Sequence, residues 1–283
     1  MRVRIGTRGS ELALLQARSV AEQIESVQSD VYTELVEIET SGDRGRGGKG
    51  PGMFVKEVNR AVAEGEVDIG VHSLKDLPTD IPTELSLACV PERLSPNDVL
   101  VSPSEDDIHS LPSGSIIGTG SLRRRAEISA QRSDLEFEKI RGNVDTRMGK
   151  VEGGEYDALI TSMAALERLG LTEKAVQEFE FEEVVPAAGQ GSLGVVKRTG
   201  DGDVDFLNSI DDEDFHREAI CERAYLKELG LGCRAGAGII ARVKDAEIKS
   251  LAVLHDSEGR RLVKLQGKDP AELGRRAASE VRK

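Results

Sequence analysis

The chain has 283 residues, with 51 acidic and 38 basic side chains and a net charge of −13. This length allows two or three domains with well-buried cores. The acidic balance excludes general nucleic-acid binding, because the phosphate backbone would be repelled. No apolar run is long enough to span a membrane. The first residues form a strand pattern rather than an apolar signal region, and the three cysteines lack metal-ligand spacing. We therefore expect a cytoplasmic protein with reduced thiols and no metal.

A strand–turn–helix pattern occurs twice along the chain. Residues 5–10 read Ile-Gly-Thr-Arg-Gly-Ser, and residues 117–121 read Ile-Gly-Thr-Gly-Ser. Each copy ends an apolar run and opens a helical pattern, so free backbone N–H groups and the helix dipole make each turn a candidate anion site. Residues 67–73 and 156–162 form a second similar pair of short apolar strands. The repetition predicts two similar α/β lobes with mostly parallel sheets and a cleft at the carboxyl ends of the strands.

The order of the segments predicts how the chain passes between the lobes. Residues 185–196 resemble a crossover and a strand that returns to the first lobe, and an acidic linker follows at 199–205. Two helical patterns and three strand patterns then predict a small α+β third domain. The expected domains are lobe 1 (1–93 with 187–205), lobe 2 (97–184) and the third domain (209–283).

One region is basic against this acidic background. Residues 115–150 contain eight Lys or Arg and five Asp or Glu. Arg123, Arg124 and Arg125 fall in the first turn of an expected helix, where the dipole disfavours cations. Pairing with Glu127, one turn later, would offset part of this charge. One carboxylate cannot serve three guanidiniums, so the pattern favours a bound polyanion.

Two further segments follow strand patterns and are expected at the same cleft. Arg141, Asn143 and Arg147 lie at a strand–helix junction, where Asn143 could instead cap the helix and the arginines could be solvated. Lys75 and Asp76 follow an apolar strand. A carboxylate among arginines can stabilise a cation or transfer protons. The residues alone favour the simpler interpretation that Asp76 caps a turn before a proline.

A glycine-rich segment and one cysteine complete the candidates. Residues 42–52 contain six glycines, so we expect either a cationic lid over the cleft or a plain linker. Cys89 and Cys221 lie in apolar patterns and are expected in the core. Cys233 lies between glycines and beside Arg234, which would favour its thiolate. It could be a nucleophile, a covalent anchor or an idle thiol, and we favour a functional thiol.

These motifs resemble the hydroxymethylbilane synthase family, also called the porphobilinogen deaminases. The resemblance is carried by residues 6–14 (GTRGSELAL), 71–78 (VHSLKDLP), 118–125 (GTGSLRRR), 141–147 (RGNVDTR), 154–171 (GEYDALITSMAALERLGL), 189–194 (GQGSLG) and 230–233 (GLGC). It implies three α/β domains, of which the first two resemble the lobes of bacterial binding proteins. The loop before Phe54 is two residues longer than the family pattern, and the run after Cys233 lacks the family's proline.

The resemblance implies an activity and a cofactor. Family members join four porphobilinogen molecules head to tail, release ammonia each time, and hydrolyse off the linear tetrapyrrole hydroxymethylbilane. The product grows on a covalent dipyrromethane cofactor, held by a thioether to a cysteine that matches Cys233. Its acetate and propionate groups form a polyanion that suits the arginines. Loss of ammonia leaves a cationic methylene-pyrrolenine, which Asp76 would stabilise as the catalytic carboxylate. We expect a monomer that binds a small-molecule substrate, with no nucleic-acid or membrane partner.

The remaining site residues are implied by matching position in the family motifs. Those expected to bind the cofactor are Lys75, Thr119, Ser121, Arg123, Arg124, Gly142, Asn143 and Arg147. Those expected to meet the substrate are Arg8, Ser10, Gln16, Phe54, Arg141 and Arg168.

Two other classes of protein share some of these features. A two-lobed solute-binding protein would explain the cleft and the repeated anion sites, but it would need neither Cys233 nor Asp76 and would normally carry a signal peptide. A ligand-sensing regulator domain would share the lobes, yet no DNA-binding helix pair or basic face is evident in the sequence. The mass of the purified chain separates these classes from an enzyme with a covalent cofactor.

Overall fold

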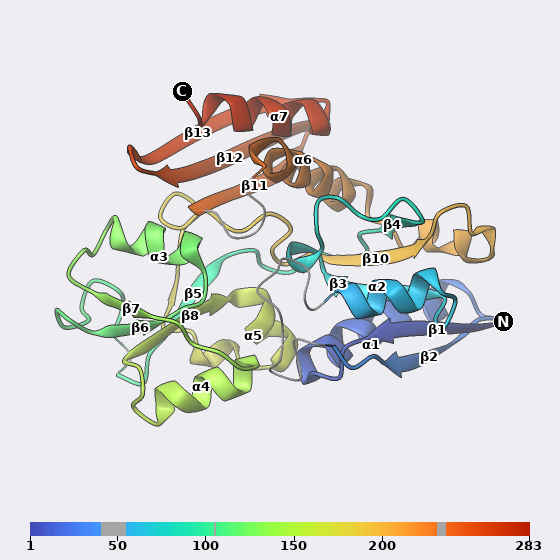
Figure 1. Cartoon of the computed structure of the whole chain (residues 1–283), viewed down its shortest axis with the longest axis horizontal. Coiled ribbons are helices and arrows are strands. Elements are labelled where there is room, and N and C mark those ends of the chain that lie inside the picture. The colour runs from blue at the N-terminus through green and yellow to red at the C-terminus, as the bar shows by residue number, and fades with distance from the viewer. Residues whose placement is uncertain (41–54, 105, 231–235) are drawn as a thin grey trace.

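The computed structural model describes residues 1–40, 55–104, 106–230 and 236–283. Figure 1 shows two α/β lobes side by side, with a smaller third domain lying across the top of both. The segment at 42–52, Phe54 and Cys233 lie outside the described residues, so the predictions made for them stay predictions.

The first lobe is built on a five-stranded sheet with the order β2-β1-β3-β10-β4. β1 pairs in parallel with β2 and β3, whereas β10 runs antiparallel to both β3 and β4. These strands are β1 (Arg2–Thr7), β2 (Tyr32–Glu37), β3 (Ile69–Ser73), β4 (Leu85–Cys89) and β10 (Leu193–Arg198). The helical elements that follow its strands are α1 (Glu11–Val27), α2 (Lys56–Ala63) and the 3-10 turn η1 (Leu74–Asp76).

The second lobe repeats this plan. Its sheet has the order β7-β6-β8-β5-β9, again with parallel pairs around β6 and with β5 antiparallel to β8 and β9. The strands are β5 (Asp98–Val101), β6 (Ile116–Gly118), β7 (Glu136–Glu138), β8 (Ala158–Ser162) and β9 (Gln177–Glu178). The helices are α3 (Leu122–Ser129), α4 (Val144–Glu152), α5 (Met163–Leu169) and the short η2 (Thr172–Lys174). The position of each strand thus has a counterpart in the other lobe, as the repeated motifs predicted.

The local sequence explains the equivalent turns after β1 and β6. The Ser10 hydroxyl accepts a hydrogen bond from Ala13 N (3.4 Å) at the start of α1, and the Ser121 hydroxyl accepts one from Arg124 N (3.3 Å) at the start of α3. A serine in this place satisfies one of the N–H groups that the first helical turn leaves unpaired. α1 buries its apolar face, including Val20 and Ile24, against the first sheet.

The third domain is a three-stranded antiparallel sheet with two helices. Its elements are α6 (Glu213–Leu229), β11 (Gly236–Lys244), β12 (Glu247–Asp256), β13 (Gly259–Gly267) and α7 (Pro270–Glu280), after the linker helix η3 (Gly202–Ser209). α6 and α7 pack together on the sheet around the buried Tyr225, whose hydroxyl donates to Val253 O at 2.7 Å. Cys221 belongs to this core and Cys89 to that of the first lobe, and both are fully buried, as expected.

A buried ion cluster joins the third domain to the segments that cross between the lobes. Arg93, in the first crossing, lies with Nη1 2.9 Å from Glu218 Oε2 and 2.8 Å from Glu222 Oε1, both carboxylates being on α6. Glu222 also accepts from Gly189 N (2.6 Å) in the second crossing and from Ala241 N (2.8 Å) in β11. The same carboxylate therefore fixes both crossings to the third domain.

The predicted fold class is confirmed. Each lobe has a mixed sheet in which three adjacent strands are parallel, and the third domain is a small α+β unit. Where the structure describes the chain, no helix is both long and apolar enough to cross a membrane.

Candidate active site

The predicted residues of lobe 1 meet at the end of β3. Arg8, Gln16 and Asp76 line one small pocket together with His72 and Ser73. Gln16 is almost fully buried and its Nε2 donates to Ser73 Oγ at 2.8 Å, which holds α1 against the end of the strand. Asp76 itself is exposed at the pocket, in the 3-10 turn after the strand. The pocket therefore combines a cationic side chain, an amide and an accessible carboxylate.

His72 forms the wall of this pocket. It is buried, and its Nε2 lies 2.9 Å from Asn59 Oδ1 on α2. Burial, with the nearby charge of Arg8, lowers the pKa of His72 to about 4, so the ring is neutral at physiological pH. The position agrees with the expectation that His72 is a buried strand residue. The described part of the chain contains no cluster of side chains suited to a metal ion.

A buried carboxylate lies between the two arginines of α3. Asp98, at the start of β5, is fully buried, with Oδ2 2.6 Å from Arg123 Nη2 and Oδ1 2.7 Å from Arg124 Nη2. Gln190 Nε2 donates to the same Oδ1 at 2.9 Å. Burial alone would raise the pKa of Asp98, but the charges of both arginines hold it below its usual value. Asp98 is therefore an ionised partner that fixes the two guanidiniums.

Lys75 reaches across the cleft to this group. Its Nζ lies 3.4 Å from Ser162 Oγ at the end of β8 and 3.3 Å from Gln190 Oε1. Burial, with the charge of Arg124, lowers the pKa of Lys75 to about 8, while Asp76 and Asp98 act in the opposite direction. Lobe 1 thus presents its lysine to the arginine cluster of lobe 2.

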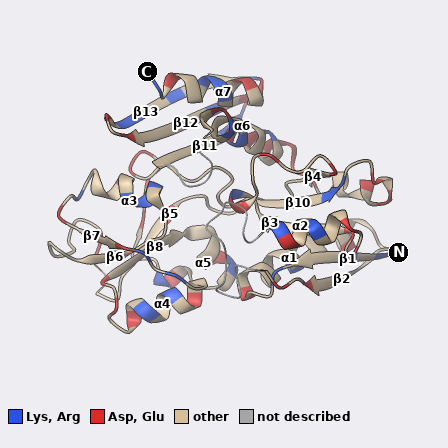
Figure 2. Ribbon diagram, in the orientation of Figure 1, with Lys and Arg blue, Asp and Glu red and all other residues tan. Residues whose placement is uncertain are grey.

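The segment at 141–147 leads into α4 and brings Arg147 within electrostatic range of Arg124 and Asp76. Figure 2 shows basic residues on both α3 and α4. Arg147 Nε donates to Gly142 O at 2.7 Å, and Gly142 has φ +113°, a conformation that favours glycine. Burial and the charge of Arg124 lower the pKa of Arg147, and Asp76 acts to raise it. Asn143 occupies the N-cap position of α4, but its side chain makes no capping hydrogen bond, while Arg141 is exposed.

Arg168 and Thr119 are bonded to neighbouring protein groups and belong to neither the pocket of Asp76 nor the cluster around Asp98. Arg168, on α5, is largely buried with Nη2 3.0 Å from Glu92 Oε1 and 3.1 Å from Gly191 O, so it braces lobe 2 against the crossing segments. Thr119 is buried behind Ser121 and accepts from Ser121 N at 3.2 Å through its hydroxyl. Of the other described candidates, the structure brings Arg8, Gln16 and Asp76 together in one pocket. It brings Lys75, Arg123, Arg124 and Arg147 together in one cluster of charges.

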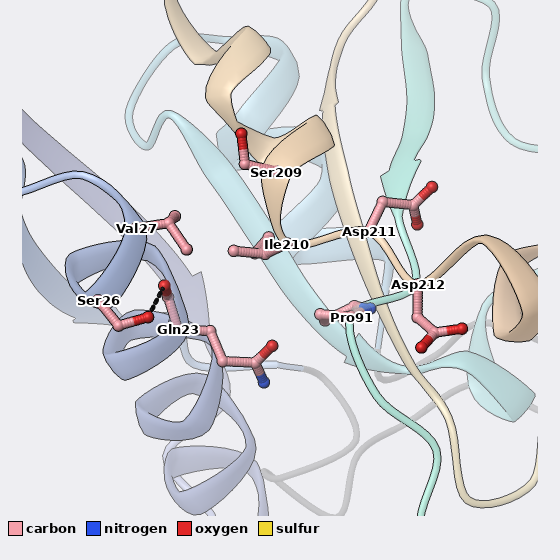
Figure 3. A pocket seen from close by; sticks show the side chains of 8 residues that line it. All are labelled: Gln23, Ser26, Val27, Pro91, Ser209, Ile210, Asp211 and Asp212. Atoms are coloured by element: carbon pink, nitrogen blue, oxygen red, sulfur yellow. Dashed lines mark hydrogen bonds between the residues drawn. The ribbon is translucent and has the colours of Figure 1, made fainter.

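A larger surface pocket lies away from all of these residues. It is open, and its walls are formed by the last turns of α1, the loop after β4 and the segment between η3 and α6 (Figure 3). Its lining residues are Gln23, Ser26, Val27, Pro91, Ser209, Ile210, Asp211 and Asp212. None of the predicted site residues contributes to it, so size alone does not locate the candidate site.

The charges at the cleft fit a ligand with several carboxylates. Lys75, Arg123, Arg124 and Arg147 bring four cations within electrostatic reach of one another, and Asp76 and Asp98 supply two carboxylates there. The described residues thus leave an excess of positive charge in a part-buried place. Burial is the main cause of the lowered pKa values of Lys75 and Arg147, and the charge of Arg124 adds to it. Negative groups of a ligand would relieve this repulsion.

Sequence reasoning missed the groups that organise the cluster. Asp98 carries a signal that could have been used, since a charged residue opens the otherwise apolar run Val99-Leu100-Val101. Gln190 lies in the quoted motif at 189–194 without an assigned role, although its side chain contacts Lys75, Arg124 and Asp98. Both residues act through partners far away in the sequence, which periodicity does not show.

Fold and site together define a two-lobed α/β protein with a cluster of basic side chains where Lys75 of lobe 1 meets lobe 2. Comparisons with known proteins identify its family. Residues 3–205 match the family domain described as "Porphobilinogen deaminase, dipyromethane cofactor binding domain", and residues 216–283 match "Porphobilinogen deaminase, C-terminal domain". The chain belongs to the porphobilinogen deaminase family, as its motifs predicted.

Relatives support this over the full length. A probable porphobilinogen deaminase of Pyrobaculum neutrophilum is 42% identical, covering 99% of this chain and 98% of that protein. The porphobilinogen deaminase of Staphylococcus carnosus is 38% identical, covering 96% and 91%. Among solved structures, the VFT2 domain of Bordetella pertussis BvgS has a TM-score of 0.43 and 14% identity, covering 74% of this chain and 84% of that one.

Proposed function

We propose that this chain catalyses the porphobilinogen deaminase reaction. Four porphobilinogen molecules are joined head to tail with loss of ammonia, and the linear tetrapyrrole hydroxymethylbilane is released by hydrolysis. The observation that carries the proposal is the arrangement of Asp76, which shares a pocket with Arg8 and Gln16 and lies within electrostatic reach of Lys75 and Arg147. A carboxylate so placed can stabilise a cation beside a carboxylate-binding surface.

The roles of the chain's own residues follow from this geometry. Arg8 and Gln16, with Ser10, bind and orient the incoming substrate, whose carboxylates suit a guanidinium and an amide. Asp76 faces the carbon from which ammonia departs. When that C–N bond breaks, its electron pair leaves with nitrogen and positive charge spreads over the pyrrole, and the nearby carboxylate stabilises this charge.

The arginine cluster holds the cofactor. Its side chains on α3 and α4, with Lys75, offer fixed cations to acetate and propionate groups, and Asp98 keeps two of the guanidiniums oriented. The dipyrromethane, when bound through Cys233, supplies the pyrrole carbon onto which the product grows. Arg141, Gly142 and Asn143 extend the carboxylate-binding edge, and we propose that Phe54 and Arg168 contribute to substrate binding. The protein acts as a cytoplasmic monomer with no nucleic-acid or membrane partner.

Intact mass tests the proposal directly. Protein purified from cells that make porphobilinogen should be heavier than its sequence by one dipyrromethane, and peptide mapping should place the excess on Cys233. An unmodified chain from such cells would instead favour a solute-binding protein.

A variant tests the role of Asp76. Asp76→Ala should retain the cofactor mass yet lose nearly all turnover, because removal of one charge-stabilising group typically lowers kcat by about 10²-fold or more. Asp80→Asn is a matched control, since Asp80 is exposed and pairs with Lys227 instead. Near-normal turnover in Asp76→Ala would reject the assigned role.

A further inference from the structure

Glu127 is the single acidic residue of α3, and its buried carboxylate contacts both the third domain and the second crossing between the lobes. It lies one helical turn after Arg123 and has no exposed surface. Its Oε2 accepts from Arg260 Nε at 2.7 Å and lies 3.2 Å from His255 Nε2, both in the third domain. Its Oε1 accepts from Val185 N at 3.2 Å. The alternative considered from the sequence was that Glu127 pairs with Arg123 or Arg124. Its hydrogen bonds go instead to Arg260 and Val185, while its charge still acts on Arg123.

The backbone of Val185 connects Glu127 to the arginine cluster. Arg123 Nη1 donates to Val185 O at 2.6 Å, while Glu127 accepts from the N–H of the same residue. Two side chains of α3 thus hold one residue of the second crossing from both sides. A displacement of Glu127 therefore moves a hydrogen-bond partner of Arg123.

The third domain presses against this junction through β11. A Cβ on Gly238 would lie 2.6 Å from Val185 O, 2.8 Å from Pro186 O and 3.0 Å from Arg123 Cδ, so only glycine fits here. The next residue, Ile239, donates its N–H to Pro186 O at 2.9 Å. An apolar cluster including Val185, Ile240 and Val253 lies beside these contacts. The sheet is therefore docked in direct contact with Arg123.

The junction also fixes the beginning of β11. Gly236 pairs with His255, the residue beside Glu127, and a Cβ on Gly236 would lie 2.9 Å from His255 Cβ. The start of β11 is therefore held against the residue that Glu127 contacts.

We propose that Glu127 is a positioning residue that sets the third domain against the arginines of α3. This inference rests on the proposed function, because it assumes that those arginines hold the cofactor. Figure 1 shows β11 and α3 facing one another across the domain boundary. The geometry separates Glu127 from the substrate pocket of lobe 1, so its loss should affect turnover more than substrate binding.

The test compares Glu127→Gln with the parent at a temperature where both are folded. The amide keeps an oxygen for Val185 N but lacks the charge that Arg260 requires. We expect kcat to fall about tenfold, because displacements of about 1 Å can cost up to 10²-fold, while KM changes less than twofold. Amide hydrogen exchange should rise at 181–186 and in α3. Glu182→Gln is the matched control: this exposed carboxylate pairs with Lys264 across the same boundary and should leave kcat and exchange unchanged.

Two further variants keep the test decisive. Arg260→Gln should reproduce the loss, and the double variant should be no worse than either single one. If Glu127→Gln fails to fold, Arg260→Gln breaks the same ion pair from the less buried side and should still lower kcat. A Glu127→Gln protein that melts earlier but keeps the parent's kcat and exchange pattern would overturn the inference. A parent that carries no dipyrromethane would instead overturn the proposed function.

Discussion

Replacement of Asp98 by asparagine tests how the arginine cluster is balanced. The carboxylate is fully buried between two guanidiniums whose side chains are 4% and 10% exposed. Burial acts to raise the pKa of Asp98, and the charges of both arginines act to lower it below its usual value. Asp98→Asn keeps the shape of the side chain but removes the negative charge that pairs with Arg123 and Arg124.

The expected loss is large for a single substitution. Removing one partner of a buried ion pair costs about 3–5 kcal/mol, because the remaining charge is buried and uncompensated. The asparagine oxygen still accepts a hydrogen bond, so we expect the lower end, about 3 kcal/mol. For a protein of roughly this size, each kcal/mol lost from the free energy of unfolding lowers Tm by about 2–4 °C. The cofactor-free protein should therefore melt about 6–12 °C earlier.

The assay compares calorimetric melting of parent and variant, each without and with dipyrromethane. Cofactor carboxylates bound to the same arginines would replace part of the missing charge, so the loss should be smaller in the loaded protein. A depressed carboxyl pKa stabilises the fold above the unfolded-state pKa of about 3.9, and this stabilisation is lost as pH falls through the folded-state value. Parent and variant should therefore converge in strong acid.

One result would refute the reasoning. If the cofactor-free Asp98→Asn protein melts within 2 °C of the parent at neutral pH, roughly the effect of 1 kcal/mol or less, the arginines do not depend on this carboxylate. Asp134→Asn is the control, since Asp134 pairs with Arg132 at the surface of the same lobe and should melt like the parent.

Two other predictions follow from the lobe contacts. The pKa of Lys75 is about 8, so its charge, and with it the affinity for carboxylates, should be lost as pH rises through that value. Incorporation of the cofactor into cofactor-free protein, followed by mass, should therefore fall up to about tenfold per pH unit above pH 8. Incorporation into Lys75→Arg should not change with pH in this range, and equal pH profiles for the two proteins would contradict the assignment. Glu222→Gln should destabilise the protein by about 3–5 kcal/mol, because Arg93 is left buried without the charge of Glu222. Denaturant unfolding would measure this loss, and Glu66→Gln is the control because Glu66 is exposed. Equal unfolding midpoints for Glu222→Gln and the parent would contradict the prediction.

The repeated motifs predicted the fold well because each signal is local. A glycine–serine turn after an apolar strand requires only adjacent residues, so the two copies at Ser10 and Ser121 marked equivalent helix starts in both lobes. The returning strand β10 was also foreseen, and it pairs with β3 and β4. Regular alternation was similarly sufficient for the strands of the third domain.

The partners of the charged residues could not be predicted in this way. Sequence spacing offered Glu127 to the arginines of α3, but the carboxylate lies against Arg260, 133 residues away. Asp98 took the place beside Arg123 and Arg124 because β5 enters the lobe antiparallel to β8 and brings its first residue to the cleft. Which charges meet depends on strand order and chain crossings, and these are properties of the whole fold.

The distribution of charge explains how an acidic protein can bind an acidic chain. A net charge of −13 repels carboxylates at long range, but salt screens such repulsion beyond about 8–10 Å. The cluster around Lys75 and Arg124 acts at hydrogen-bond distance in a part-buried place, where screening is weak. Asp98 neutralises only part of this cluster, so its arginines stay oriented while positive charge remains for a ligand. Under the proposed function, affinity for the carboxylates of the cofactor therefore depends on the preset geometry of a few cations rather than on the net charge of the protein.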